Sequence, residues 1–147
     1  MKKKVLILGG SSDIGIEVIK KFLKDKWVVI AHYSKNSHEL KKIKSKNLKI
    51  FKYDLKNIYK FEEFLKKNSL FNNINSYISL TGYINSANFS DIKIIDFYDH
   101  INVNYLSNLI ILKKILPQMK KNNFGRVLLS SSTGVKFGGG ETTPLYS

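Results

Sequence analysis

Short hydrophobic runs alternate with longer amphipathic segments along the whole chain. The runs have the character of buried strands, whereas the segments between them carry hydrophobic residues at helical spacing and lysines elsewhere. This alternation predicts an α/β fold in which helices connect the strands of a parallel sheet. The predicted strands are Val5–Leu8, Trp27–Ala31, Leu48–Tyr53, Ile74–Leu80 and Arg126–Ser130.

The segments between the strands predict helices of different character. They cover Asp13–Lys24, Ser37–Lys44, Ile58–Lys66 and a mostly helical region from Asp91 to Met119. Leu48–Tyr53 alternates hydrophobic residues with lysine, which favours a half-exposed strand at a sheet edge. Pro117 is expected to bend or end the last helix, and Gly134–Pro144 to form a glycine-rich loop.

The helical stretch Tyr105–Leu116 is apolar around most of its circumference. A helix of this kind needs cover on two sides, and one side would meet the sheet. In a small α/β domain the second cover often comes from another subunit, so we expect a homo-oligomer.

Length and composition predict one domain spanning residues 1–147. The chain has 43% hydrophobic residues, enough for one core. It has no cysteine, which excludes disulfides, thiolate zinc sites and cysteine nucleophiles, and no metal site is predicted. The N-terminal apolar run is too short for an export signal, and no segment reaches the length of a membrane span. We therefore expect a soluble cytoplasmic protein without a membrane partner.

The formal net charge is +14, so an anionic ligand or partner has to be considered. Arg126 is the only arginine, however. Lysine lacks the planar fork that reads base edges, so the charge is poorly suited to sequence-specific nucleic-acid recognition. A basic protein that binds nucleic acid non-specifically remains an open alternative.

The most informative segment is Leu6–Gly15, where the first strand turns into the first helix. Glycine there permits a tight turn and a close approach of backbone to a pyrophosphate, and the helix N-terminus favours negative charge. A turn capped by Ser11, Ser12 or Asp13 without a ligand is the alternative.

This segment resembles the T-G-x-x-x-G-x-G fingerprint of the short-chain dehydrogenase/reductase family, compact branch. Gly9 and Gly15 match its outer glycines, while Leu8 replaces the usual threonine and Asp13 the middle glycine. The resemblance implies a Rossmann-type, doubly wound parallel sheet. It also implies coenzyme contacts from residues of the turn and the helix start, namely Gly9, Ser11, Ser12, Asp13, Ile14 and Gly15.

Two later segments carry the resemblance further. Asp54, followed by Leu55, matches the family aspartate that binds the adenine amino group, and Leu55 is assigned to the same coenzyme site. From the residues alone, Asp54 is also a common type of helix cap. The segment Ser79–Gly82 occupies the place of the family's N-N-A-G motif, and Gly82 is its clean match.

The end of the second strand bears on which coenzyme is bound. An acidic side chain there holds the ribose hydroxyls of NAD. Tyr33, Ser34 and Lys35 include no acid, and Ser34 and Lys35 could bind the additional phosphate of NADP. We therefore expect NADP rather than NAD, although Lys35 is also compatible with a solvated side chain.

The resemblance also implies the reacting centre. Ser131 would donate a hydrogen bond to a substrate carbonyl, although counting back from the tyrosine points nearer Thr133. Tyr146 begins a Y-x-x-x-K motif and would transfer the proton, with the motif lysine falling at position 150. Asn104, in a segment similar to the family's D-V-N-L, would hold a water in the proton relay.

These features predict the N-terminal three-fifths of an NADP-dependent short-chain oxidoreductase, truncated after the tyrosine. It would transfer hydride between nicotinamide and a carbonyl or secondary alcohol. A 3-oxoacyl substrate and a sugar-type ketone are both open. A dinucleotide-binding module or inactive fragment without turnover is the main alternative.

Overall fold

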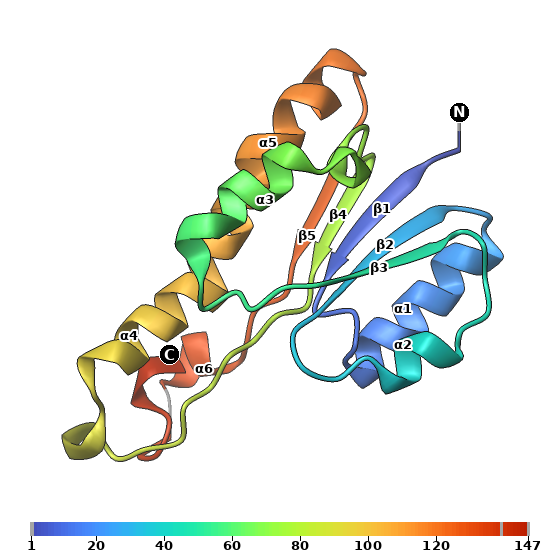
Figure 1. Ribbon diagram of the computed structural model, residues 1–147. Helices are drawn as coiled ribbons and strands as arrows, with labels where there is room; N and C mark the ends of the chain where they lie inside the picture. The colour runs from blue at the N-terminus through green and yellow to red at the C-terminus, as the bar shows by residue number, and fades with distance from the viewer. Residues whose placement is uncertain (1, 139, 147) are drawn as a thin grey trace.

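Five parallel strands form one sheet, in the order β3-β2-β1-β4-β5 (Figure 1). The computed structural model describes residues 2–138 and 140–146. The strands are β1 (Lys4–Leu8), β2 (Val28–Tyr33), β3 (Leu48–Lys52), β4 (Ser76–Ser79) and β5 (Arg126–Leu129). The chain builds outward from β1 to β3 and then returns to the other side of β1. This reversal leaves a crevice at the carboxyl ends of β1 and β4, where ligands bind in open α/β sheets.

Helices cover both faces of the sheet. They are α1 (Asp13–Lys24), α2 (His38–Lys42), α3 (Phe61–Lys67), α4 (Ile94–Ile101), α5 (Ser107–Lys121) and α6 (Gly134–Phe137). Short 3₁₀ turns lie at Ile58–Lys60, Ser69–Phe71, Phe89–Asp91 and Pro144–Tyr146. In Figure 1, α1 and α2 lie on one side of the sheet, and α3 and α5 on the other.

The central strand β1 divides the core into two clusters. Val5 and Ile7 pack on the face that carries α1, whereas Leu6 and Leu8 pack on the face that carries α5. Successive side chains of a strand point to opposite faces, so both faces of β1 are buried. All four side chains are fully buried, which explains the uninterrupted hydrophobic run.

The sequence predicted the five strands, and each is confirmed with small differences at its ends. The helix predicted over Asp13–Lys24 is found with the same bounds, and β3 lies at a sheet edge as expected. The helix predicted over Ile58–Lys66 begins with a 3₁₀ turn and continues as α3.

Pro117 lies inside α5 and does not end it, so the expectation that the helix stops at this proline was wrong. α5 continues through it to Lys121. Ile111, Ile115 and Met119 are buried against the sheet, and this packing holds the helix in place despite the missing N–H of proline.

The prediction of a loop throughout Gly134–Pro144 was also wrong at its beginning. The segment opens with the single turn α6. The Ser132 hydroxyl accepts a hydrogen bond from the N–H of Gly134 at 3.1 Å, and Lys136 N–H donates to Thr133 O at 2.9 Å. These local bonds supply a helix start that the glycine content does not indicate.

Apolar surface is exposed at β5 and on the outer side of the last helices. Val127, Leu128 and Leu129 are 42%, 53% and 50% exposed, and β5 pairs with β4 alone within the described ranges. Tyr105 and Leu116 are also exposed, so one side of the apolar helix is covered and the other is open. None of the helices in residues 2–138 and 140–146 is long and apolar enough to cross a membrane.

Candidate functional site: a coenzyme crevice

A tight turn connects β1 to α1 and is shaped by Gly9 and Ser12. Gly9 has φ +74°, a conformation that side-chain-bearing residues rarely adopt. The Ser12 hydroxyl donates to Gly9 O at 2.9 Å and accepts from the N–H of Gly15 at 3.1 Å. Ser12 is therefore the N-cap of α1, one of the three residues that the sequence analysis considered for this cap.

Two glycines in this turn stand where a side chain would collide with backbone. A Cβ on Gly9 would lie 2.9 Å from the carbonyl carbon and oxygen of Leu80. A Cβ on Gly15 would lie 2.7 Å from Gly10 O. The turn therefore packs backbone against backbone, which brings main-chain N–H groups to the helix start. The first N–H groups of a helix have no intrahelical acceptor, and together with the helix dipole they favour an anion.

A cavity of about 630 Å³ opens beside this turn, at the carboxyl ends of the strands. Its volume lies within the range of about 300–1,000 Å³ that is usual for ligand pockets. Its lining comes from the turn, the ends of β2 and β3, the segment after β4 and the helical region: Gly9, Ser11, Ser12, His32, Ser34, Lys35, Asp54, Leu55, Lys56, Leu80, Thr81, Gly82, Tyr83 and Val103.

His32, near the end of β2, joins three strand ends. Its Nδ1 accepts a hydrogen bond from the N–H of Gly9 at 3.3 Å, and its Nε2 lies 2.8 Å from Tyr53 O. The ring is 3% exposed and lies 5.3 Å from the ring of Phe51, measured between centroids. Burial lowers the pKa of His32, against the opposing effects of its bond to Tyr53 and of the Asp54 charge.

Lys56 and Tyr83 line the crevice, and Lys56 forms an ion pair with Asp99 of α4. Lys56 Nζ lies 2.6 Å from Asp99 Oδ2 and 3.0 Å from the Tyr83 hydroxyl, and 4.2 Å from the centre of the Tyr83 ring. The hydrogen bond to Asp99 raises the pKa of Lys56, so the ammonium stays charged. The cluster ties the segments after β3 and β4 to α4.

Asn104, in the helical region, is hydrogen-bonded to the backbone of Tyr83, in the segment after β4. Its side chain accepts from Tyr83 N–H at 2.7 Å and donates to Tyr83 O at 2.9 Å. Asn104 lies in a π-helical stretch, Asn102–Leu106, between α4 and α5. The side chain of Asn108, one turn later, donates to Asn104 O at 3.0 Å. The structure therefore brings Asn104 to the rim of the crevice.

The other two predicted reacting residues lie further along the chain. Ser131 follows β5 and is exposed. The 3₁₀ turn Pro144–Tyr146 contacts α4, but the side chain of Tyr146 lies outside the described part of the structure. The catalytic roles of Ser131, Tyr146 and Asn104 stay predictions.

The crevice gathers most of the predicted coenzyme residues. Gly9, Ser11, Ser12, Ser34, Lys35, Asp54, Leu55 and Gly82 line it. Asp13, Ile14, Gly15 and Tyr33 do not contribute to the lining of the cavity. Gly15 is buried behind the turn, whereas Ile14 is 68% exposed at the helix start.

The sequence analysis did not identify several residues that line the crevice. Four of them are His32, Lys56, Tyr83 and Val103, and each adjoins a predicted site residue along the chain. The available signal was position: side chains at and just after a parallel strand's carboxyl end share one edge of the sheet. A histidine inside the hydrophobic run of β2 was a second signal, because a buried polar ring needs partners.

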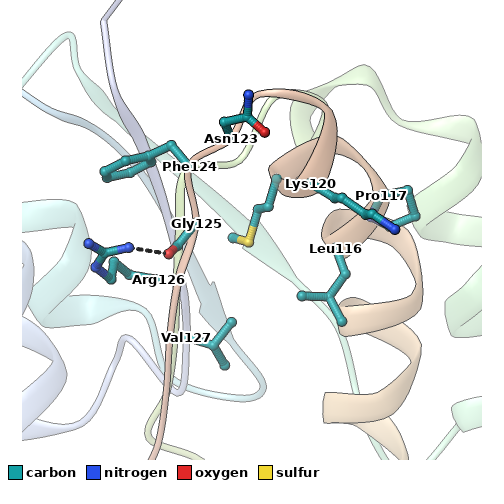
Figure 2. A pocket seen from close by; sticks show the side chains of 9 residues that line it. Leu116, Pro117, Lys120, Asn123, Phe124, Gly125, Arg126 and Val127 are labelled. Atoms are coloured by element: carbon teal, nitrogen blue, oxygen red, sulfur yellow. Dashed lines mark hydrogen bonds between the residues drawn. The ribbon is translucent and has the colours of Figure 1, made fainter.

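A second, more open hollow of about 780 Å³ lies between the end of α5 and β5. Figure 2 shows the side chains that line it. The hollow lies at the amino end of β5, whereas the glycine turn lies at the carboxyl end of β1. Its charged side chains are Lys120 and Arg126, and Arg126 donates to the carbonyl of Gly125 at 2.8 Å. Ligands of parallel sheets bind at the opposite end, so the crevice is the better candidate site.

Similarity to known proteins agrees with a coenzyme crevice at this position. The sequence profile of the family described as short chain dehydrogenase matches residues 3–147. The chain belongs to this family. Among curated proteins, none matches the chain significantly.

Solved structures share the fold. ElxO with NADP bound is 28% identical, with a TM-score of 0.77 and coverage of 99% of this chain and 61% of that one. A protein from Bacillus thuringiensis, assigned as a 3-oxoacyl-reductase, is 19% identical with a TM-score of 0.83, covering 99% and 64%. A short chain dehydrogenase from Leptospira borgpetersenii with bound NAD+ is 20% identical with a TM-score of 0.77, covering 99% and 59%. The chain therefore spans about three-fifths of the length of these proteins.

Proposed function

We propose that the crevice binds a nicotinamide dinucleotide, preferentially NADP(H), as part of an oxidoreductase acting on a carbonyl or secondary alcohol. The observation that carries the proposal is the turn at Gly9, where a Cβ would collide with the backbone of Leu80. This turn leads into the N-terminus of α1, at the point where the strand order reverses. Close backbone packing at a helix start suits a pyrophosphate.

The residues of the crevice fit the parts of such a coenzyme. The Gly9–Gly15 turn and the first N–H groups of α1 would hold the diphosphate. Asp54 and Leu55 would hold the adenine, with Gly82 allowing the nucleotide to lie against backbone. A cavity of about 630 Å³ provides the space.

The preference for NADP(H) rests on the end of β2. Ser34 and Lys35 line the crevice, and neither can repel a phosphate. Lys35 would supply positive charge and Ser34 a hydroxyl donor to the 2′-phosphate. The presence of NADP in ElxO is in line with this preference, and the NAD+ bound to the Leptospira protein identifies the competing coenzyme.

In the proposed reaction, three further residues would have roles beside the coenzyme. The bound coenzyme would supply or accept a hydride. Ser131 would donate a hydrogen bond to the substrate oxygen and stabilise its negative charge, and Tyr146 would exchange the proton of the hydroxyl. Asn104 would fix the backbone at Tyr83, to which its side chain is bonded, and so support the proton relay. The substrate class is a ketone or secondary alcohol, with 3-oxoacyl and sugar-type compounds as the first to assay.

Titration of the purified 147-residue chain with NADPH and NADH, followed by coenzyme fluorescence and calorimetry, tests the proposal. We expect saturable binding of both, tighter for NADPH. Lys35→Ala should weaken NADPH binding about 3- to 10-fold, the effect of one exposed charge-assisted contact, and leave NADH binding unchanged. Lys41→Ala, an exposed lysine of α2 outside the crevice, is the matched control.

The outcomes separate the possible functions. No binding of either coenzyme would overturn the proposal. Binding with reduction of a ketone would support the oxidoreductase, whereas binding without turnover would reduce the function to a dinucleotide-binding module. Retention on DNA that falls steeply with salt, without coenzyme binding, would favour the nucleic-acid alternative.

A further inference from the structure

His32 is a buried polar side chain that the coenzyme proposal does not use. It lies in β2, a strand whose other buried residues, Val29, Ile30 and Ala31, are apolar. A buried imidazole loses its contact with water, so its two nitrogens need protein partners. Both have one, at Gly9 and at Tyr53.

The hydrogen bonds determine the form of the ring. The N–H of Gly9 can only donate, so Nδ1 must present its lone pair. Tyr53 O can only accept, so Nε2 must carry the proton. His32 is therefore the neutral, Nε2-protonated tautomer. Its lowered pKa, caused by burial, is in line with a ring that stays neutral near pH 7.

The bond to Gly9 acts on the residue that shapes the coenzyme turn. Gly9 is held on both sides: its N–H donates to His32, and its carbonyl accepts from the Ser12 hydroxyl at 2.9 Å and the Ser12 N–H at 3.2 Å. These bonds fix the peptide planes before and after a residue with φ +74°. The ring thereby links the turn to the end of β3, next to Asp54.

We propose that His32 is a positioning residue of the coenzyme crevice, which holds the Gly9 turn in its binding conformation through the Nδ1 bond. The proposal rests on the coenzyme function proposed above. It assigns the effect to one nitrogen of the ring: the bond to Gly9 preorganises the turn, whereas the bond to Tyr53 orients the ring.

Two substitutions separate these bonds. In His32→Asn, the amide oxygen can take the place of Nδ1 and accept from Gly9, whereas the bond to Tyr53 is lost. In His32→Gln, the longer side chain can place its NH₂ group near the Nε2 position and donate to Tyr53, whereas Gly9 loses its acceptor. The two variants are similar in polarity and each removes one buried hydrogen bond, so a purely structural role would affect them alike.

The experiment measures NADPH affinity and thermal unfolding for the wild type and both variants. We expect His32→Asn to bind within about 3-fold of the wild type and His32→Gln to bind at least about 10-fold more weakly, at similar melting temperatures. Equal affinities in the two variants, or weaker binding by His32→Asn, would overturn the positioning role while leaving the coenzyme function intact.

A second measurement does not depend on coenzyme or on substitution. In ¹⁵N NMR spectra of the wild-type chain at pH 7, the His32 ring should show an unprotonated Nδ1 and a protonated Nε2. A proton on Nδ1 would overturn the proposal, because that nitrogen could not accept from Gly9. Failure of the wild type to bind NADPH or NADH would instead overturn the coenzyme function, and the positioning role with it.

Discussion

Asn104 holds the backbone of Tyr83 by both of its polar groups, with the side-chain oxygen 2.7 Å from Tyr83 N and the side-chain nitrogen 2.9 Å from Tyr83 O. The pair fastens the segment after Gly82 to the π-helical stretch between α4 and α5. This segment lines the crevice, so the asparagine shapes a wall of the site.

Replacing Asn104 by alanine should therefore loosen this wall. Asn104→Ala removes two hydrogen bonds of about 0.5–1.5 kcal/mol each, so we expect a loss of about 1–3 kcal/mol in the free energy of unfolding. NADPH affinity should fall as well, since Tyr83 lines the crevice. Urea unfolding and coenzyme titration measure the two effects. Asn88→Ala, at an exposed asparagine, is the control, and equal behaviour of the two variants would contradict the prediction.

Gly9→Ala should abolish coenzyme binding, because the new Cβ would lie 2.9 Å from the backbone of Leu80 and the turn would have to open. Gly138 provides a matched control. Its φ is +78°, close to that of Gly9, but a Cβ there would meet nothing within 4 Å. Gly138→Ala should carry only the backbone strain of about 1–3 kcal/mol that φ +78° with ψ 168° imposes on a residue with a side chain, and it should retain binding. NADPH binding by Gly9→Ala with wild-type affinity would show that the close approach is not needed.

Tyr77→Phe should destabilise the core. The buried Tyr77 hydroxyl donates to Asn108 Oδ1 at 2.5 Å, and its removal leaves that oxygen unpaired. We expect a loss of about 1–3 kcal/mol in the free energy of unfolding, measured by urea titration. Tyr59→Phe, at a side chain that is 90% exposed, should have no effect. The double variant Tyr77→Phe/Asn108→Leu should lose less than the sum of the two single variants, and strict additivity would argue against a coupled pair.

The same tyrosine predicts a dependence on alkaline pH. Burial raises the pKa of Tyr77 in the folded chain, so the folded state keeps the phenol proton that the unfolded state loses near pH 10. Its contribution to stability is complete below that pH and declines as the pH rises above it. Unfolding free energies measured from pH 8 to 11 should decrease more steeply for the wild type than for Tyr77→Phe. Parallel curves would contradict the prediction.

The apolar edge at β5 should cause self-association of the 147-residue chain. Leu128 is 53% exposed on a strand whose outer side is unpaired within the described residues, and such edges associate with other chains. Leu128→Lys should shift the sedimentation profile toward the monomer at equal concentration. Tyr59→Lys adds the same charge at an isolated exposed position and should leave the profile unchanged. A monomeric wild type would contradict the prediction.

The sequence by itself determined the fold class, the strand positions and the part of the site that is local in the chain. Val5–Leu8 is buried on both faces, which explains the continuous hydrophobic run from which the strand was predicted. Gly9 and Ser12 lie three residues apart and act within one turn, so their arrangement is encoded by neighbours along the chain. Local sequence also specified the bounds of α1, and it restricted the cap to three neighbouring residues, of which Ser12 is the one used.

Only the tertiary structure decided which distant residues meet in the crevice. His32 contacts Gly9 across 23 positions, and Lys56 reaches Asp99 across 43. These contacts depend on the strand order β3-β2-β1-β4-β5 and on where each strand ends, which hydrophobic periodicity does not specify. The continuation of α5 through Pro117 was decided in the same way, because burial of Ile115 and Met119 against the sheet outweighs the local preference of proline.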